Sequence, residues 1–135
     1  MNDFRNLQAW HKAHALALTV YRATSAFPSA ERFGLVAQIR RAAVSVSASI
    51  AESCGRRTHR DEARLLQMAF GSACELEAEL LLARDLGFLP VGEHTPLATD
   101  LVEVKRMLGT LAARTFDRAS SSRQPSAVSV RPSDG

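Results

Sequence analysis

The chain has 135 residues and a mass of 14.7 kDa, which is the size of one domain. Hydrophobic residues make up 46% and charged residues 23%, and the 22 alanines and 16 leucines favour helices over a β-sandwich or barrel. The net charge of +3 does not by itself indicate a nucleic-acid-binding protein. No apolar run reaches membrane-spanning length and no signal peptide is recognisable, so we expect a cytoplasmic protein.

The first half of the chain carries two helical patterns. Apolar residues at alternating steps of three and four predict a helix over residues 6–26, ended by Pro28. A second helix is expected from Ser29, as its N-cap, to the residue before Gly55. Its core-facing residues are Leu35, Ile39, Ala42, Val46 and Ile50. The opposite side is also apolar, which predicts contact with another copy of the chain. That side consists of Ala37, Val44, Ala48 and Ala51.

A third helix is expected to begin after Thr58, with Asp61 three residues beyond this cap, and to end at Gly87. Its core-facing residues are Leu65, Ala69, Ser72, Leu76, Leu80 and Ala83. A second apolar side again exceeds what one small chain needs. That side consists of Leu66, Phe70, Ala73 and Leu81.

The fourth helix is predicted to begin at Thr95, with Pro96 in the first helical position. Its core positions follow a spacing of about 3.5 residues, which suits near-parallel packing in a bundle. They are Leu97, Leu101, Val104, Leu108, Leu111 and Thr115. Residues 119–135 are rich in serine, arginine and proline and are expected to form a disordered tail. The sequence therefore predicts an all-α, antiparallel up-down-up-down four-helix bundle over residues 1–118.

Few side chains form a pattern typical of catalysis. His11 and His14 lie three residues apart but have no accompanying ligand set at metal-binding spacing. Glu75 and Glu79 share a helix face, where pairing of Glu79 with an arginine or a backbone group is favoured over acid–base catalysis. No nucleophile elbow, phosphate loop or dinucleotide-binding glycine pattern is present. We therefore expect no enzymatic activity, no metal and no cofactor.

The basic residues are concentrated in one stretch. Seven arginines lie between Arg32 and Arg64, where there are only three acidic residues. Arginine binds phosphate bidentately and stacks on bases, so the cluster indicates an anionic partner such as nucleic acid. An exposed turn with ordinary helix-end charges explains the cluster equally well. The candidate nucleic-acid-binding residues are Arg40, Arg41, Arg56, Arg57, Arg60 and Arg64.

Two segments carry a family resemblance. The sequence QIRRAAVSVSASIAESCGR (residues 38–56), followed by LLQMAFGSACELEAELLLARDLGFL (residues 65–89), resembles the four-helix-bundle family of 23S rRNA intervening-sequence proteins. The resemblance covers about residues 4–112. The chain departs from the family pattern at Ser47, Ser49 and Ser53, which stand where Pro, Asn and Gly are usual.

The resemblance implies an assembly and a partner. Members of the family were first noticed as reading frames inside insertions in bacterial large-subunit rRNA genes. The family is similar to the accessory protein of diversity-generating retroelements, a homopentameric barrel that binds nucleic acid and a reverse transcriptase. We therefore expect a ring-shaped homo-oligomer, namely a pentamer, with RNA or DNA as a partner. The expected subunit contacts are Ala37, Val44, Ala48, Ala51, Leu66, Phe70 and Leu81.

Three functions are compatible with these sequence features. The favoured one is a non-enzymatic, homo-oligomeric scaffold that binds nucleic acid through arginines. The second is a protein-docking adaptor whose arginines pair with the chain's own glutamates or with carboxylates of a partner protein. The third and weakest is a metal-dependent enzyme that uses the histidines.

Overall fold

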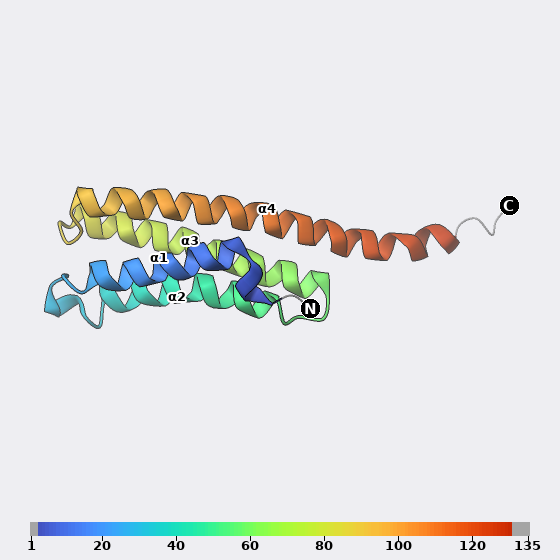
Figure 1. The fold of residues 1–135 in the computed structure, drawn as a ribbon, viewed down its shortest axis with the longest axis horizontal. Helices are drawn as coiled ribbons and strands as arrows, with labels where there is room; N and C mark the ends of the chain where they lie inside the picture. Colours follow the sequence, from blue (N-terminus) through green and yellow to red (C-terminus); the bar gives the residue numbers. More distant parts are fainter. Residues whose placement is uncertain (1–2, 131–135) are drawn as a thin grey trace.

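The protein folds into four α-helices joined by short connections (Figure 1). This computed structural model describes the backbone of residues 3–130 and the side chains of residues 3–121. The helices are α1 (Gln8–Thr24), α2 (Leu35–Ser53), α3 (His59–Asp85) and α4 (Val91–Val130), and the short 3-10 helices η1 (Phe4–Asn6) and η2 (Ser29–Glu31) precede α1 and α2. Residues 3–130 contain no strand, which confirms the all-α prediction.

The helices pack as a bundle. Helix α1 contacts α2 and α4, and α3 contacts the same two helices from the other side. The connections α1–α2 and α3–α4 lie at one end of the molecule, and the α2–α3 turn lies at the other (Figure 1). The last part of α4 extends past the other three helices at the end that holds the α2–α3 turn.

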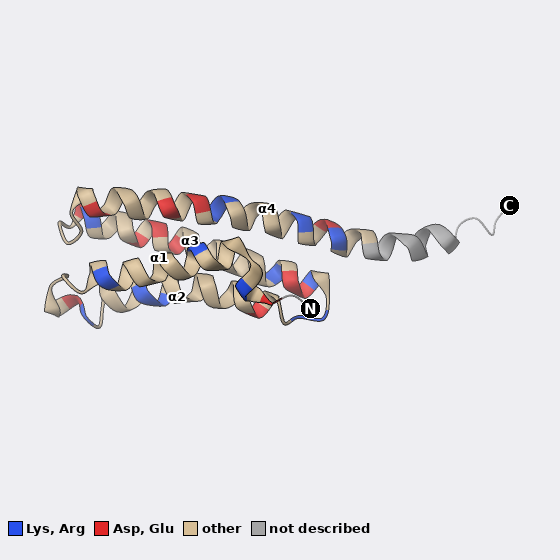
Figure 2. Cartoon of the chain, viewed as in Figure 1, with Lys and Arg blue, Asp and Glu red and all other residues tan. Residues whose placement is uncertain are grey.

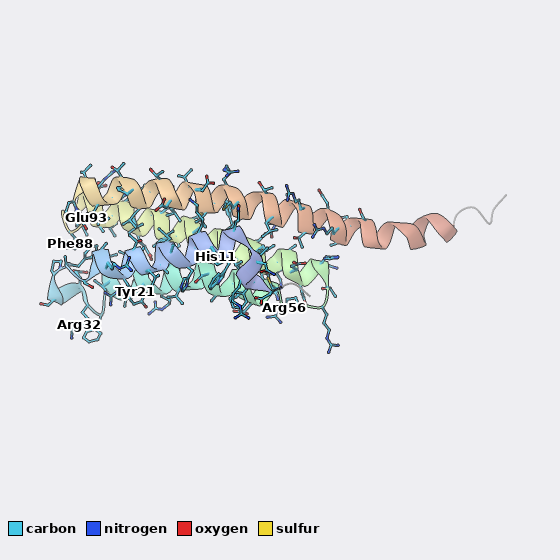
Figure 3. All side chains as sticks on the ribbon, in the orientation of Figure 1. His11, Tyr21, Arg32, Arg56, Phe88 and Glu93 are labelled. Atoms are coloured by element: carbon cyan, nitrogen blue, oxygen red, sulfur yellow. The ribbon has the colours of Figure 1, made fainter. Side chains whose placement is uncertain are left out.

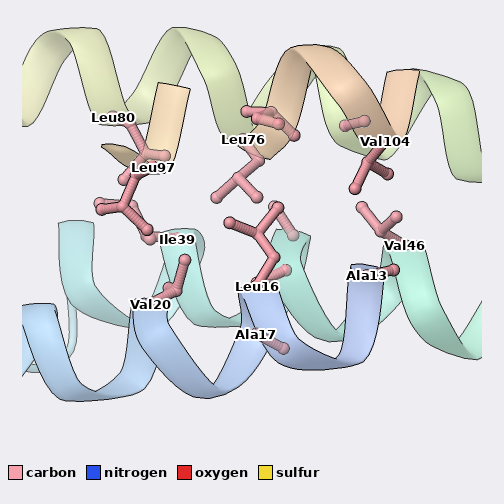
Figure 4. Packing of buried hydrophobic residues seen from close by; sticks show 14 of the residues in the cluster. Ala13, Leu16, Ala17, Val20, Ile39, Val46, Leu76, Leu80, Leu97 and Val104 are labelled. Atoms are coloured by element: carbon pink, nitrogen blue, oxygen red, sulfur yellow. The ribbon is translucent and has the colours of Figure 1, made fainter. Parts of the chain in front are cut away.

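The core lies along the axis of the bundle and uses side chains from all four helices. Figure 4 shows these side chains pointing toward one another, among them Leu16 of α1, Val46 of α2, Leu76 of α3 and Val104 of α4. Full burial of a side chain of this size contributes about 1.5–3 kcal/mol to stability. The predicted core residues of α2 are all buried, and so are all those of α3 and α4 except the half-buried Ser72 and Leu111.

The predicted helix boundaries at Thr58 and Gly87 are confirmed. The Thr58 hydroxyl oxygen accepts a hydrogen bond from the Asp61 backbone N–H at 3.1 Å and so caps α3. Gly87 follows the end of α3 with a φ of 82°, a left-handed conformation that glycine adopts without steric cost. The N–H groups of Phe88 and Leu89 then return to the Ala83 carbonyl at 2.9 and 3.2 Å.

Two predicted helix starts are wrong. Ser29 begins the short η2, and α2 starts only at Leu35, because the backbone leaves helical geometry at Gly34. Helix α4 starts at Val91, four residues before Thr95, because the Pro90 carbonyl already accepts the N–H groups of Glu93 and His94 at 2.9 Å. Thr95 donates its hydroxyl hydrogen to the Val91 carbonyl from inside the helix.

The structure continues α4 to Val130, past the boundary predicted at residue 118. Helical hydrogen bonds are local, so a helix can propagate beyond the elements that it packs against. The tail predicted over residues 119–135 therefore begins inside a helix, and residues 131–135 lie outside the described part of the chain. The disorder expected of the tail stays a prediction.

One residue expected in a subunit contact belongs to the interior of a single chain: Leu66 is only 1% exposed. Phe70 is half-buried, with one part against the core and another part lining a surface hollow. The reason is that α3 packs against both α2 and α4, so two of its sides are covered without a partner. Of the other expected contacts, Val44, Ala48 and Leu81 are exposed. Ala37 and Ala51 are half-buried.

The substitution Leu66→Ala tests this assignment. It should lower the free energy of unfolding by about 2–5 kcal/mol, because it removes buried methyl groups and leaves a cavity. Leu82→Ala, on the same helix at a side chain that is 50% exposed, is the matched control and should cost less than about 1 kcal/mol. Urea unfolding at one protein concentration measures both. Equal losses for the two variants would contradict the core assignment.

Candidate nucleic-acid interface

The six predicted arginines do not form one cluster in space. Arg40 and Arg41 lie in the first half of α2, whereas Arg56, Arg57, Arg60 and Arg64 surround the α2–α3 turn (Figure 2). Helix α2 rises about 1.5 Å per residue, so about 20 Å separates the two groups along its axis. The basic stretch of the sequence is therefore divided in space between α2 and the α2–α3 turn, because a helix separates residues that are near in sequence, and the binding role of these arginines stays a prediction.

Arg40 has a structural task that the sequence pattern does not reveal. Its Nε donates a hydrogen bond to Thr24 Oγ1 at 2.9 Å, and its Nη2 donates to the Tyr21 carbonyl at 3.1 Å. The guanidinium lies over the Tyr21 ring, 4.5 Å from its centroid. A cation in this position stabilises the carbonyl end of α1. Arg40 is thus engaged in holding α1 to α2, and its role in binding nucleic acid stays a prediction.

Arg41 is exposed on α2 between two hollows. The hollow toward α1 has a volume of about 590 Å³ and is also lined by Tyr21, Arg32 and Val44. The hollow toward α3 has a volume of about 360 Å³, and Arg41 lines it together with two glutamates. The hollow toward α1 is therefore lined by basic groups, whereas the hollow toward α3 contains Arg41 and both glutamates.

Glu79 lines the acidic hollow together with Glu75. Its Oε1 atom is buried and accepts no hydrogen bond from any described residue. Burial raises the pKa of the Glu79 carboxyl, and the nearby charge of Glu75 adds to this effect while Arg41 opposes it. The sequence predicts a hydrogen-bonded partner for Glu79, and for this oxygen that prediction is wrong within the described chain.

At the α2–α3 turn, two of the four arginines already have an acidic neighbour. Arg56 pairs with Glu52 at 3.3 Å, and Arg64 Nε lies 3.8 Å from Asp61. The two arginines and their two acidic partners are each at least 40% exposed. Ion pairs this exposed contribute about 0–1 kcal/mol to the stability of a protein. Such weak pairs can exchange their carboxylate for a phosphate.

The other two arginines of the turn, Arg57 and Arg60, are exposed and form no ion pair with any described residue. They line a hollow of about 500 Å³ together with Thr58, His59 and residues of α4. The positive end of the α3 dipole adds to their potential. This hollow is the strongest candidate for binding an anionic group.

Phe116 lines the same hollow from α4, and sequence reasoning missed it. Only one signal points to this residue: it is a large apolar side chain that follows Thr115, the last position of the core stripe. The periodicity of α4 therefore places Phe116 outside the core, and the structure places it beside Arg57 and Arg60.

The two N-terminal histidines are engaged in local contacts. His11 Nε2 lies 2.6 Å from the Arg5 carbonyl oxygen, and the His14 ring is stacked on Trp10 with 4.8 Å between the centroids. No group of three or more His, Cys, Asp and Glu residues in the described part of the chain is placed to hold a metal ion. Within that part, no helix is both long and apolar enough to cross a lipid bilayer.

The fold and these surfaces define a small four-helix protein with a basic turn at one end of the bundle. The chain belongs to the 23S rRNA-intervening sequence protein family, whose model matches residues 5–110. This match confirms the family resemblance seen in the sequence. It includes the α2–α3 turn and ends before Phe116.

A solved structure has a similar fold. It is described as a protein with unknown function from the S23 ribosomal protein family of Bacteroides thetaiotaomicron. The two chains are 20% identical, with a TM-score of 0.70, and the similarity covers 77% of this chain and 97% of the other. No curated protein matches the chain.

The substitution Arg40→Ala tests the structural task of that side chain. It should lower the free energy of unfolding by roughly 1–3 kcal/mol, because it removes charge-assisted hydrogen bonds to the end of α1. Arg22→Ala, at an exposed arginine on α1, is the control and should change stability by less than about 0.5 kcal/mol. Thermal unfolding followed by circular dichroism measures both. An Arg40→Ala variant as stable as the control would show that Arg40 is free for another role.

Proposed function

We propose that this protein is a non-enzymatic scaffold in which several copies form a ring and bind RNA or DNA through arginines of the α2–α3 turn. The repeating unit is the antiparallel up-down-up-down bundle, and a pentamer is the expected assembly. The nucleic-acid-binding residues are Arg56, Arg57, Arg60 and Arg64, and Arg41 belongs to the subunit contact. A reverse transcriptase is a further partner that the family resemblance implies.

The two hollows beside α2 support the assembly. The hollow toward α1 carries Arg32 and the hollow toward α3 carries Glu75 and Glu79, while Arg41 lies between them and lines both. Arginines of one copy can therefore face glutamates of the next. A contact between two different surfaces joins copies head to tail, and such contacts generate rings when the rotation closes. An arginine of the next copy seated in the second hollow would lie near the Glu75 and Glu79 side chains that line it and would offset their negative charge.

Exposed apolar residues on the same helix add to this argument. Val44 is 44% exposed, and Ala48, one turn further along α2, is exposed as well. Covering these residues in a subunit contact would remove apolar surface from water.

The substitution Ala48→Glu tests the assembly by light scattering. The wild type should have a mass several times 14.7 kDa, and the variant should dissociate because it places an unpaired charge in the contact. Thr99→Glu, at an exposed position of α4, introduces the same charge elsewhere and should leave the mass unchanged. A wild-type mass of 14.7 kDa at micromolar concentration would contradict the ring.

One observation carries the nucleic-acid part of the proposal: Arg57 and Arg60 are exposed, lack an acidic partner among the described residues and line one hollow. A ring would repeat this pair once per subunit. The modest charge of one chain would then become a strong field around the assembly, which attracts a polyanion.

The double substitution Arg57→Ala/Arg60→Ala tests this part in a fluorescence-anisotropy titration with labelled RNA and DNA. The variant should bind more weakly, and the slope of log affinity against log salt should flatten by about 0.7–0.9 for each lost phosphate contact. Arg22→Ala/Arg84→Ala removes the same charge at the opposite end of the bundle and should have a smaller effect.

Absence of binding by the wild type at low salt would contradict nucleic-acid binding. The protein-docking adaptor would then be favoured, with the arginines pairing to carboxylates of a partner protein. Equal loss in the two double variants would show that net charge, and not the turn, is responsible.

A further inference from the structure

We infer that the hollow between the α2–α3 turn and α4 binds unpaired bases of a single-stranded nucleic acid, with Phe116 as the stacking surface and Arg57 and Arg60 as phosphate contacts. This inference rests on the proposed nucleic-acid binding and specifies the form of the ligand. Arg56 marks this end of the molecule in Figure 3.

Phe116 is positioned to offer its ring to a ligand. The side chain is 55% exposed, although its neighbour Thr115 is fully buried. The ring lines two hollows at once: the one that contains Arg57 and Arg60, and a second of about 560 Å³ between α3 and α4. An exposed aromatic ring beside two unpaired arginines is the combination with which proteins hold single strands without reading their sequence.

The second hollow is suited to a flat, apolar ligand face. Its walls include Phe70, Ala112 and Ala113, and Gly109 contributes no side chain to it. A Cβ atom added at Gly109 would lie 4.0 Å from Phe70 Cε2, in van der Waals contact. The glycine therefore leaves the space beside the Phe70 ring open. Hollows of a few hundred Å³ with apolar walls and few polar groups are typical of small-ligand and base-sized sites.

The charges around Phe116 determine on which side of the ring the phosphate backbone of the strand lies. Arg57 and Arg60 line the hollow between Phe116 and the α2–α3 turn, whereas Asp117 and Gln67 line the second hollow, between α3 and α4. A phosphate is attracted to the arginines and repelled by Asp117. The Asp117 carboxylate can instead accept hydrogen bonds at the edge of a base, and the Gln67 amide can accept or donate them. The backbone of the strand therefore lies toward the turn and its bases toward α4.

This arrangement favours a single strand over a duplex. In a duplex the bases are stacked on one another and paired, so a protein ring reaches their faces only after unstacking them. Unpaired bases present their faces freely and stack on aromatic side chains. Phosphate contacts alone would not distinguish the two forms.

The experiment compares three probes of equal length by fluorescence anisotropy: oligothymidine, an abasic phosphodiester strand and a DNA duplex. The abasic strand carries the same backbone charge without bases. The wild type should bind oligothymidine roughly 5- to 150-fold more tightly than the abasic strand for each stacked base. Phe116→Ala should lower oligothymidine affinity to the abasic level and leave abasic binding unchanged. Arg57→Ala/Arg60→Ala should weaken binding of all three probes.

Two further variants make the comparison specific. Phe33→Ala removes a ring that is 89% exposed and adjacent to Arg32 at the opposite end of the molecule, so it should leave the preference for bases intact (Figure 3). Phe116→Leu keeps an apolar side chain but removes the ring, and it should lose the base preference as Phe116→Ala does. It serves in place of Phe116→Ala where the latter does not fold.

The outcomes separate the two proposals. Equal binding of oligothymidine and the abasic strand by the wild type would overturn base stacking and leave nucleic-acid binding standing. Binding of no probe at all would overturn both. Loss of assembly mass by Phe116→Ala with an unchanged base preference would identify the ring as part of a subunit contact and overturn the inference.

Discussion

The arrangement of surface groups depends on the fact that α2 and α3 are each buried between two neighbours. Helix α2 packs against α1 and α3, and α3 packs against α2 and α4. Apolar residues on two sides of each helix are therefore used inside the chain, as the burial of Leu66 demonstrates. Only one strip of α2 remains outward-facing, whereas α3 exposes a broader surface. Arg41, Val44 and Ala48 lie on that strip of α2, and their chemistry is what another molecule meets.

The same packing gives arginines of one helix different tasks. Arg40 lies near enough to the end of α1 to form hydrogen bonds with Thr24 and the Tyr21 carbonyl, so it stabilises the α1–α2 contact. Arg41, the next residue, is rotated by about 100° around the helix and stays exposed between a basic and an acidic hollow. Two adjacent arginines thus have different roles: Arg40 stabilises a contact between helices, and Arg41 is exposed to other molecules.

The α2–α3 turn combines features from distant parts of the chain. Its arginines surround the N-terminus of α3, and α4 passes beside it because it continues beyond the other helices (Figure 1). This passage brings Phe116 into the hollow with Arg57 and Arg60. The family match ends at residue 110, so the aromatic part of this hollow lies outside the segment that defines the family.

The sequence by itself determined the helical class, the presence and order of four helices, most of the core and the family. These features follow from local patterns: apolar spacing, the Thr58 cap and the Gly87 stop act on neighbouring residues, as their hydrogen bonds and backbone angles confirm. Only the tertiary structure decided that Arg40 holds α1, that Leu66 is interior and that Phe116 lies beside Arg57. Each depends on which helix packs against which side of another, and helical periodicity shows that a side is apolar without showing what covers it.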